Sequence, residues 1–216
     1  MPRRAEDTRH KLIRAAEELF AERGVGAASL REINRHAGQR NATALQYHFV
    51  NRAGLVSAVL AKHRDDVESR RHAMLDRYDA APADLRALAA ALVVPEAEKL
   101  EDPDGGPEYL RIMAQLLQRP DFPFDPSAPH SPHRSIHRWR HLVARWVPEL
   151  AIQQLHRRFA AIRIMYVELG RRAETPRRRD HRLFVSHLID LITAILAAPV
   201  SAETDALVRD RRAPRA

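Results

Sequence analysis

Side chains suited to reading DNA bases are concentrated between residues 40 and 48. Arg40, Asn41, Thr43 and Gln46 occupy polar positions in and just before a predicted short helix. Asn and Gln can form two hydrogen bonds with adenine, Arg can do the same with guanine, and the methyl group of Thr can contact that of thymine. These four residues are therefore the candidate base-reading set.

Further polar side chains around this stretch are suited to contacts with phosphate groups, which fix the register of a protein on DNA. They are Ser29, Arg31, Tyr47, His48 and Arg52. Arg52 also follows Asn51 at the start of a predicted helix, where backbone amides attract phosphate. Tyr47 has an equally supported alternative, because its ring could instead be buried at the edge of the helical pair.

Three helices are expected to position these residues. The first covers about residues 8–23 and has apolar side chains along one face. The second opens at Ser29, where Ser29 and Glu32 match the capping-box pattern, and Gly38 ends it. The third covers about residues 41–49. Two short helices joined by a glycine turn and braced by a third make a helix-turn-helix, whose second helix enters the major groove of DNA.

The rest of the chain also predicts helices and no strands. The expected helices cover about residues 52–78, 83–100, 108–118, 133–147, 148–173 and 180–197, with a proline-rich loop at 120–132. We therefore predict an all-α fold. Its expected parts are a three-helix DNA-binding domain (1–52), a helical effector-binding and dimerisation domain (53–200) and a flexible tail (201–216).

The charge of the chain favours a polyanionic partner. Its net charge is +8 and its isoelectric point is about 10.6. Residues 1–60 hold ten Lys or Arg against six Asp or Glu, a net of +4. Nearly all of the positive charge is arginine, a bias that a GC-rich genome explains equally well. The chain has no cysteine, which excludes disulfides and thiol catalysis.

Membrane and secretory segments are not expected. The longest apolar stretch, near residues 183–198, is interrupted by Ser186, His187 and Asp190. It is too short and too polar to span a bilayer, so we expect no membrane partner. The first residues lack the apolar run of a signal peptide, and we expect a cytoplasmic protein.

The histidines of the central region do not predict a metal site. His133, His137 and His141 recur at four-residue steps, and His130 precedes them. Such spacing can bind a metal, but no acid or cysteine nearby completes the ligand set. A solvated or pocket-lining stripe is therefore expected, with no metal and no cofactor. Zinc-hydrolase, phosphate-loop and serine-elbow motifs are also missing, so the sequence does not indicate an enzyme.

Several segments between residues 8 and 60 form a family pattern. They are Thr8-Arg9, Leu19 to Gly24, Ser29 to Ile33, Ala37-Gly38, Tyr47 to Phe49, Arg52 and Leu55. Together they resemble the DNA-binding domain of the TetR family of bacterial regulators. The chain departs from the common pattern by one extra residue before Phe49, by Gln46 in place of a frequent tyrosine, and by Arg52 in place of lysine. The resemblance implies a helical dimer whose C-terminal domain binds a small ligand and releases DNA.

Two apolar helical stripes near the C-terminus predict a dimer interface. The first consists of Leu155, Phe159, Ile162 and Tyr166, and the second of Phe184, Leu188, Leu191, Ile192 and Ile195. An apolar surface of this breadth needs two partners, its own domain and another chain. Two such helices from each subunit would form a four-helix interface in a two-fold symmetric homodimer.

Large apolar side chains of the C-terminal region could line a ligand cavity. They are Tyr109, Met113, Trp139, Trp146 and Tyr166. For each of them, plain packing in the core is the alternative interpretation.

The expected function is sequence-specific transcriptional regulation. The chain is expected to act as a repressor that binds a palindromic operator in double-stranded DNA and is released by a small apolar or amphipathic effector. The alternative is a non-specific architectural DNA-binding protein, which would rely on phosphate contacts and lose affinity steeply with salt. The base-reading chemistry of Asn41, Thr43 and Gln46 argues against this alternative.

Overall fold

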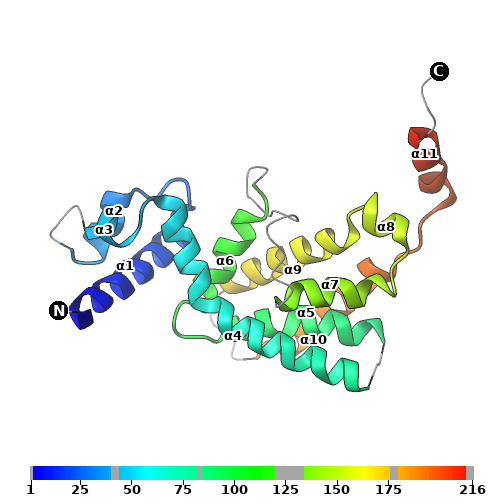
Figure 1. Ribbon diagram of the computed structural model, residues 1–216, viewed down its shortest axis with the longest axis horizontal. Helices are drawn as coiled ribbons and strands as arrows, with labels where there is room; N and C mark the ends of the chain where they lie inside the picture. The colour runs from blue at the N-terminus through cyan, green and yellow to red at the C-terminus, as the bar shows by residue number, and fades with distance from the viewer. Residues whose placement is uncertain (1, 40–43, 82–83, 120–133, 176–179, 213–216) are drawn as a thin grey trace.

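Helices make up all of the regular secondary structure in the residues that the computed structural model describes, which are 2–39, 44–81, 84–119, 134–175 and 180–212. In chain order they are α1 (Pro2–Arg23), α2 (Leu30–His36), α3 (Ala44–His48), α4 (Arg52–Ala80), α5 (Leu85–Ala97), the 3-10 helix η1 (Glu98–Leu100), α6 (Gly106–Leu116), α7 (Ser135–Ala144), α8 (Glu149–Gln153), α9 (Arg157–Glu174), α10 (Arg182–Ala197) and α11 (Ala202–Arg212). The prediction of an all-α fold is confirmed. Figure 1 shows α1, α2 and α3 grouped at one end of the molecule, with α4 leading from them to the other helices.

The short helices at that end are held by the capping residues that the sequence predicts. The hydroxyl oxygen of Ser29 accepts a hydrogen bond from the amide of Glu32 (3.2 Å), and the Glu32 carboxylate accepts one from the amide of Ser29 (2.9 Å). These bonds lower the pKa of Glu32, so its carboxylate is ionised at the N-terminus of α2, where negative charge is favourable. At the start of α4, the side-chain oxygen of Asn51 accepts a hydrogen bond from the amide of Gly54 (2.9 Å).

The N-terminal helices share an apolar core that reaches beyond them. Phe20 of α1 and Leu45 of α3 are buried in it, and Leu55 and Val59 of α4 close one side. Two side chains from much later in the chain, those of Ile112 and Leu116 in α6, belong to the same core. The helix-turn-helix is therefore packed against α6 as well as against α4.

A second, larger core is formed by α4 to α10. Trp139 is fully buried in it, and its indole N–H donates a hydrogen bond to the carbonyl oxygen of Leu88 (2.8 Å). Helices α6 and α9 lie so close that a Cβ atom on Gly170 would stand 2.6 Å from the Cβ of Ala114. The lack of a side chain at residue 170 is what allows the two helices to approach each other to this distance.

A buried polar cluster stands inside this larger core. Pro95 lies within α5 and has no amide hydrogen, so it cannot bond to the carbonyl of Ala91 one turn earlier. The buried guanidinium of Arg71 donates to this carbonyl instead (3.2 Å), and it also pairs with the buried carboxylate of Glu96 (3.0 Å). Its third contact is a hydrogen bond to the hydroxyl of Ser135 (3.2 Å). The gap that the proline leaves in the helix ladder is thus filled by a charged side chain from α4.

Several helix boundaries differ from the predicted ones. The first helix begins at Pro2, and the helix predicted at residues 148–173 is split into α8 and α9. Helix α8 ends at Gln153, and α9 starts after its N-cap His156, whose backbone adopts a left-handed conformation (φ 48°). Where a flexible tail was expected from residue 201, the structure has α11. The proline-rich loop at 120–132, together with His130 and His133, lies outside the described residues.

Helix α11 extends away from the body of the molecule, beyond the end of α10 (Figure 1). Within the described part of the chain, no single helix is long and apolar enough to cross a membrane. Of the described helices, only α10 and α11 together are long and apolar enough, and these two helices are bent by 53° relative to each other.

Candidate nucleic-acid interface

The outer surface of α3 presents polar and aromatic side chains to solvent. Leu45 and Phe49 point into the core and fix the helix, whereas the ring of Tyr47 is 82% exposed. The ring of His48 is half-buried and lies edge-on to that of Tyr47, with their centroids 5.1 Å apart. The alternative of a buried Tyr47 is therefore wrong, and its hydroxyl is free to meet a phosphate or a base.

The base-reading set lies largely outside the described residues. This holds for Arg40, Asn41 and Thr43. Gln46 lies within α3, two residues before His48.

Two of the residues predicted to contact phosphate also form hydrogen bonds within the helix-turn-helix. The hydroxyl of Ser29 is engaged in the cap of α2. The guanidinium of Arg52 donates to the carbonyl oxygens of Val25 (2.7 Å) and Ala28 (2.5 Å) in the turn between α1 and α2. Arg52 thus ties the first turn of α4 to the helix pair, a role that its position at a helix N-terminus did not reveal. Arg31 is exposed on α2 and remains a candidate for contact with phosphate.

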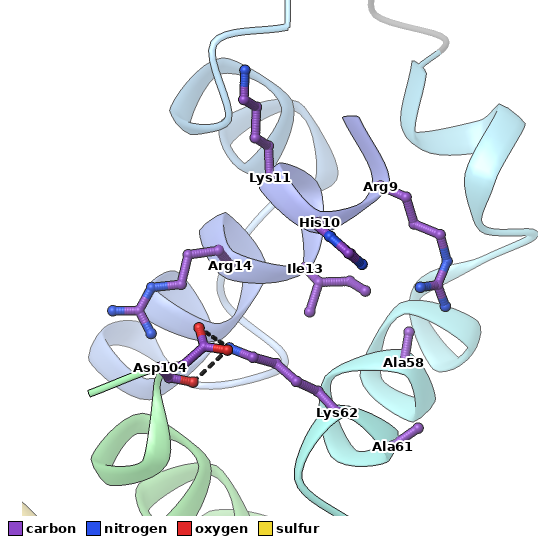
Figure 2. Close-up of a pocket in the computed structure, with 9 residues that line it drawn as sticks. All are labelled: Arg9, His10, Lys11, Ile13, Arg14, Ala58, Ala61, Lys62 and Asp104. Atoms are coloured by element: carbon purple, nitrogen blue, oxygen red, sulfur yellow. Dashed lines mark hydrogen bonds and ion pairs between the residues drawn. The ribbon is translucent and has the colours of Figure 1, made fainter. Parts of the chain in front are cut away.

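Basic side chains of the N-terminal region surround a hollow between α1 and α4. It has a volume of about 570 Å³ and is lined by Arg9, His10, Lys11, Ile13, Arg14, Ala58, Ala61, Lys62 and Asp104. Figure 2 shows that Arg9, Lys11 and Arg14 point in different directions, and that Lys62 is bonded to Asp104. The charges therefore do not converge on one ligand. Arg14 and Lys62 are instead paired with carboxylates of Glu17, Glu18 and Asp104.

The predicted pocket residues are used in packing and internal hydrogen bonds. Tyr109, Trp139 and Tyr166 are buried in the larger core, and Met113 packs against it. Trp146 is 46% exposed, and its indole N–H donates to the hydroxyl of Tyr78 (2.8 Å). A hollow of about 670 Å³ lies elsewhere, between α5 and α10, and none of these five residues lines it.

The predicted dimer residues divide between the inside and the outside of the chain. Four of them are buried in the larger core and cannot reach a partner: Ile162, Tyr166, Leu188 and Ile192. The others lie partly or largely at the surface of α9 and α10 or just before them: Leu155, Phe159, Phe184, Leu191 and Ile195. Two exposed apolar residues were missed, Ile164 and Leu183. Leu183 could have been found from its spacing, because it lies two helical turns before Leu191.

The remaining histidines of the predicted stripe, His137 and His141, lie on α7. Within the part of the chain that the structure describes, no three or more His, Asp or Glu side chains are grouped so that they could hold a metal ion.

Comparisons with known proteins identify a matching family model and a similar fold. Residues 12–59 match the family model described as bacterial regulatory proteins, tetR family. The fold is similar to that of Mycobacterium smegmatis AmtR, with a TM-score of 0.50 and 17% identity over 94% of this chain and 93% of that one. A gamma-butyrolactone receptor (ArpA-like protein) aligns with a TM-score of 0.44 and 21% identity over 95% and 93% of the two chains. No curated protein matches the sequence.

Proposed function

We propose that this chain is a DNA-binding transcriptional regulator of the TetR family. It acts as a homodimeric repressor that leaves a palindromic operator when a small apolar or amphipathic effector binds. In this proposal residues 1–52 bind DNA and residues 53–200 bind the effector and form the dimer. The observation that supports it is the helix-turn-helix, in which buried Leu45 and Phe49 anchor α3 and the ring of Tyr47 faces outward.

Selection of random DNA by the purified protein tests the proposal directly. A palindromic consensus in the bound pool is expected, because a two-fold symmetric dimer presents two equivalent helices to successive major grooves. A pool without consensus, whose retention falls steeply with salt, would instead support the architectural alternative and refute sequence-specific regulation.

Tyr47 is proposed to donate its hydroxyl to a phosphate of the operator. The change Tyr47→Phe removes only this donor and is expected to weaken operator binding about tenfold, the usual scale for one hydrogen bond to a charged group. Fluorescence anisotropy at a fixed salt concentration measures the affinity. Because the side chain is 82% exposed, helix content by circular dichroism should stay unchanged. An unaltered affinity would remove Tyr47 from the interface.

The outward faces of α9 and α10 are proposed as the dimer interface. Leu183 and Leu191 are 83% and 41% exposed in the single chain and lie on one stripe of α10. Ile164 of α9 is exposed as well. The change Leu191→Glu would bury an unpaired carboxylate from each subunit, which costs several kcal/mol. We expect the dimer dissociation constant to rise at least about 100-fold.

Sedimentation equilibrium measures this change, with Leu207→Glu as the matched control. Leu207 is also an exposed leucine, but it lies on α11, outside the proposed interface of α9 and α10, so its replacement should leave the dimer intact. A wild-type monomer at micromolar concentration would contradict the interface, and so would equal dissociation constants for Leu191→Glu and the wild type.

A further inference from the structure

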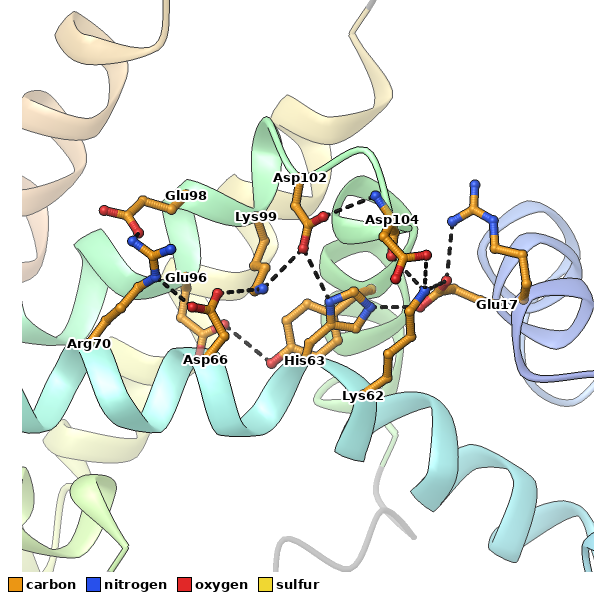
Figure 3. A network of polar contacts seen from close by, with 12 residues as sticks. Glu17, Lys62, His63, Asp66, Arg70, Glu96, Glu98, Lys99, Asp102 and Asp104 are labelled. Atoms are coloured by element: carbon orange, nitrogen blue, oxygen red, sulfur yellow. Dashed lines mark hydrogen bonds and ion pairs between the residues drawn. The ribbon is translucent and has the colours of Figure 1, made fainter. Parts of the chain in front are cut away.

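A line of buried polar contacts leads from the DNA-binding helices into the larger core (Figure 3). It starts at Glu17 of α1, whose side chain is completely buried. One carboxylate oxygen accepts hydrogen bonds from Lys62 (2.9 Å) and Arg14 (3.2 Å), and the other lies 2.7 Å from Nε2 of His63. Lys62 and His63 both belong to α4, so the carboxylate joins α1 to the helix that connects the two cores.

The same carboxylate lies against the start of α6. A Cβ atom on Gly105, the N-cap of α6, would stand only 1.9 Å from Oε2 of Glu17. The N-terminus of a helix carries partial positive charge, which stabilises a carboxylate placed there. Gly105 also has φ 87°, a left-handed conformation that favours glycine. Glu17 thus has fixed electrostatic partners on α4 and at the N-terminus of α6.

His63 continues the line into the larger core. Its buried ring stacks on that of Tyr109, with a centroid distance of 4.7 Å, and its Nδ1 lies 3.7 Å from the carboxylate of Asp102. Asp102 and Asp66 of α4 share the ammonium group of Lys99 (3.0 and 2.7 Å). The hydrogen bond from Lys99 lowers the pKa of Asp66. Burial would raise the pKa of Asp102, but bonds from the Asp104 amide and Lys99 lower it. This part of α4 is therefore held by ionised groups.

Tyr109 connects His63 to the buried carboxylate of Glu96. Its hydroxyl donates to Glu96 (3.2 Å), as does the hydroxyl of Tyr166 from α9 (2.6 Å). Burial, and then the charge of Glu96, raises the pKa of both tyrosines, so both hydroxyls keep their protons and act as donors. With Arg71 also bonded to it, Glu96 collects contacts from α4, α6 and α9.

We propose that the contacts Glu17–His63–Tyr109–Glu96 couple the C-terminal core to the DNA-binding helices, which rests on the proposed function of this chain as an operator-binding regulator. The line begins on α1, beside the helix-turn-helix, and ends at Glu96 in the core predicted to bind the effector. Each member is buried, so losing one contact changes the electrostatic environment of the next group in a medium of low dielectric. A rearrangement around Glu96 therefore shifts the contacts of Glu17.

Hydrogen exchange of the full-length protein, measured by mass spectrometry without DNA, tests this coupling. The change Tyr109→Phe removes one hydroxyl and keeps the stacked ring. We expect it to speed exchange of amides in residues 13–21 of α1 about tenfold, although the lost bond lies in the other core. Glu96→Gln should act in the same direction. If Glu96→Gln fails to fold, Tyr109→Phe alone decides the outcome.

The control is Arg157→Met, which removes a different buried cation of the larger core. Arg157 donates to the carbonyl oxygens of Leu196 and Ala198 and takes no part in the line. Exchange rates of both variants are compared after correction for the loss of global stability measured by urea unfolding, and on that scale Arg157→Met should leave exchange in α1 unchanged. If Arg157→Met speeds exchange in α1 as much as Tyr109→Phe does, the effect is a general loss of stability. If Tyr109→Phe leaves exchange in α1 unchanged, the contacts do not couple the two cores. Either result overturns the proposal.

A second arm uses the DNA duplex recovered by selection as the probe. Because coupling is reciprocal, this duplex should slow exchange around Glu96 in the wild type and have a smaller effect there in Tyr109→Phe. Equal effects in the two proteins would contradict the coupling. If selection recovers no duplex, the proposed function fails, whereas the arm without DNA still decides whether the two cores are coupled.

Discussion

Replacing Gly170 with valine is expected to lower the free energy of unfolding by at least about 3 kcal/mol. The reason is the close approach of α6 and α9, where a Cβ atom on Gly170 would stand 2.6 Å from the Cβ of Ala114 and 3.4 Å from the carbonyl oxygen of Leu110. The clash is with the Cβ of Ala114, which is attached directly to the helix backbone and cannot rotate away, whereas the Leu110 oxygen is at an ordinary contact distance. Denaturation by urea, followed by circular dichroism, measures the change.

A matched glycine and a compensating change make this prediction specific. Gly54 also lies in a helix, but a Cβ there would meet its nearest neighbour at an ordinary 3.7 Å. Gly54→Ala should therefore be neutral or stabilise the protein by up to about 1 kcal/mol. The milder Gly170→Ala should regain stability when combined with Ala114→Gly, which removes the atom it meets. If the pair is no more stable than Gly170→Ala alone, the clash is not the cause.

Breaking the Arg71–Glu96 pair on one side is expected to cost about 3–5 kcal/mol of stability. Both side chains are almost completely buried, so Arg71→Met or Glu96→Leu leaves the opposite charge without its partner. The double variant should lose much less stability than the sum of the two single losses, because neither member of the pair is then left as an unpaired buried charge. A coupling energy of about 2 kcal/mol or more is expected.

A double-mutant cycle of urea unfolding measures this coupling. The exposed pair of Arg209 and Asp205, one turn apart on α11, is the control, and Arg209→Ala should change stability by less than about 0.5 kcal/mol. Additivity of the Arg71 and Glu96 changes to within about 0.5 kcal/mol would show that their burial, and not their contact, determines the cost.

The N-terminal helices could be predicted well because their signals are local. The capping box of Ser29 and Glu32 and the cap at Asn51 each act within one helical turn, and the structure has all of them. The break at His156 could not be predicted in this way. A left-handed backbone at a residue other than glycine is imposed by the packing of the helices on either side, and the sequence around it carries no stop signal.

Which side of α9 and of α10 faces the core could not be predicted, because both helices have apolar residues over a broad part of their circumference. Periodicity identified Leu188 and Leu191 as members of one stripe, but packing against α5 and α9 buries the first and leaves the second exposed. The polar line was missed for a related reason. Charged residues are normally assigned to solvent, although Glu17 stands one turn from Ile13 and from Ala21, both of which are buried. That spacing was the available signal.

The position of α6 in both cores has a consequence for how the molecule melts. Ile112 and Leu116 complete the core of the DNA-binding helices, while Leu110 and Leu117 of the same region belong to the larger core. Opening either core therefore withdraws side chains from the other, and the two have no separate melting transitions. They should instead unfold as one cooperative unit. A molecule that binds only the folded C-terminal part then protects the DNA-binding helices against heat as well.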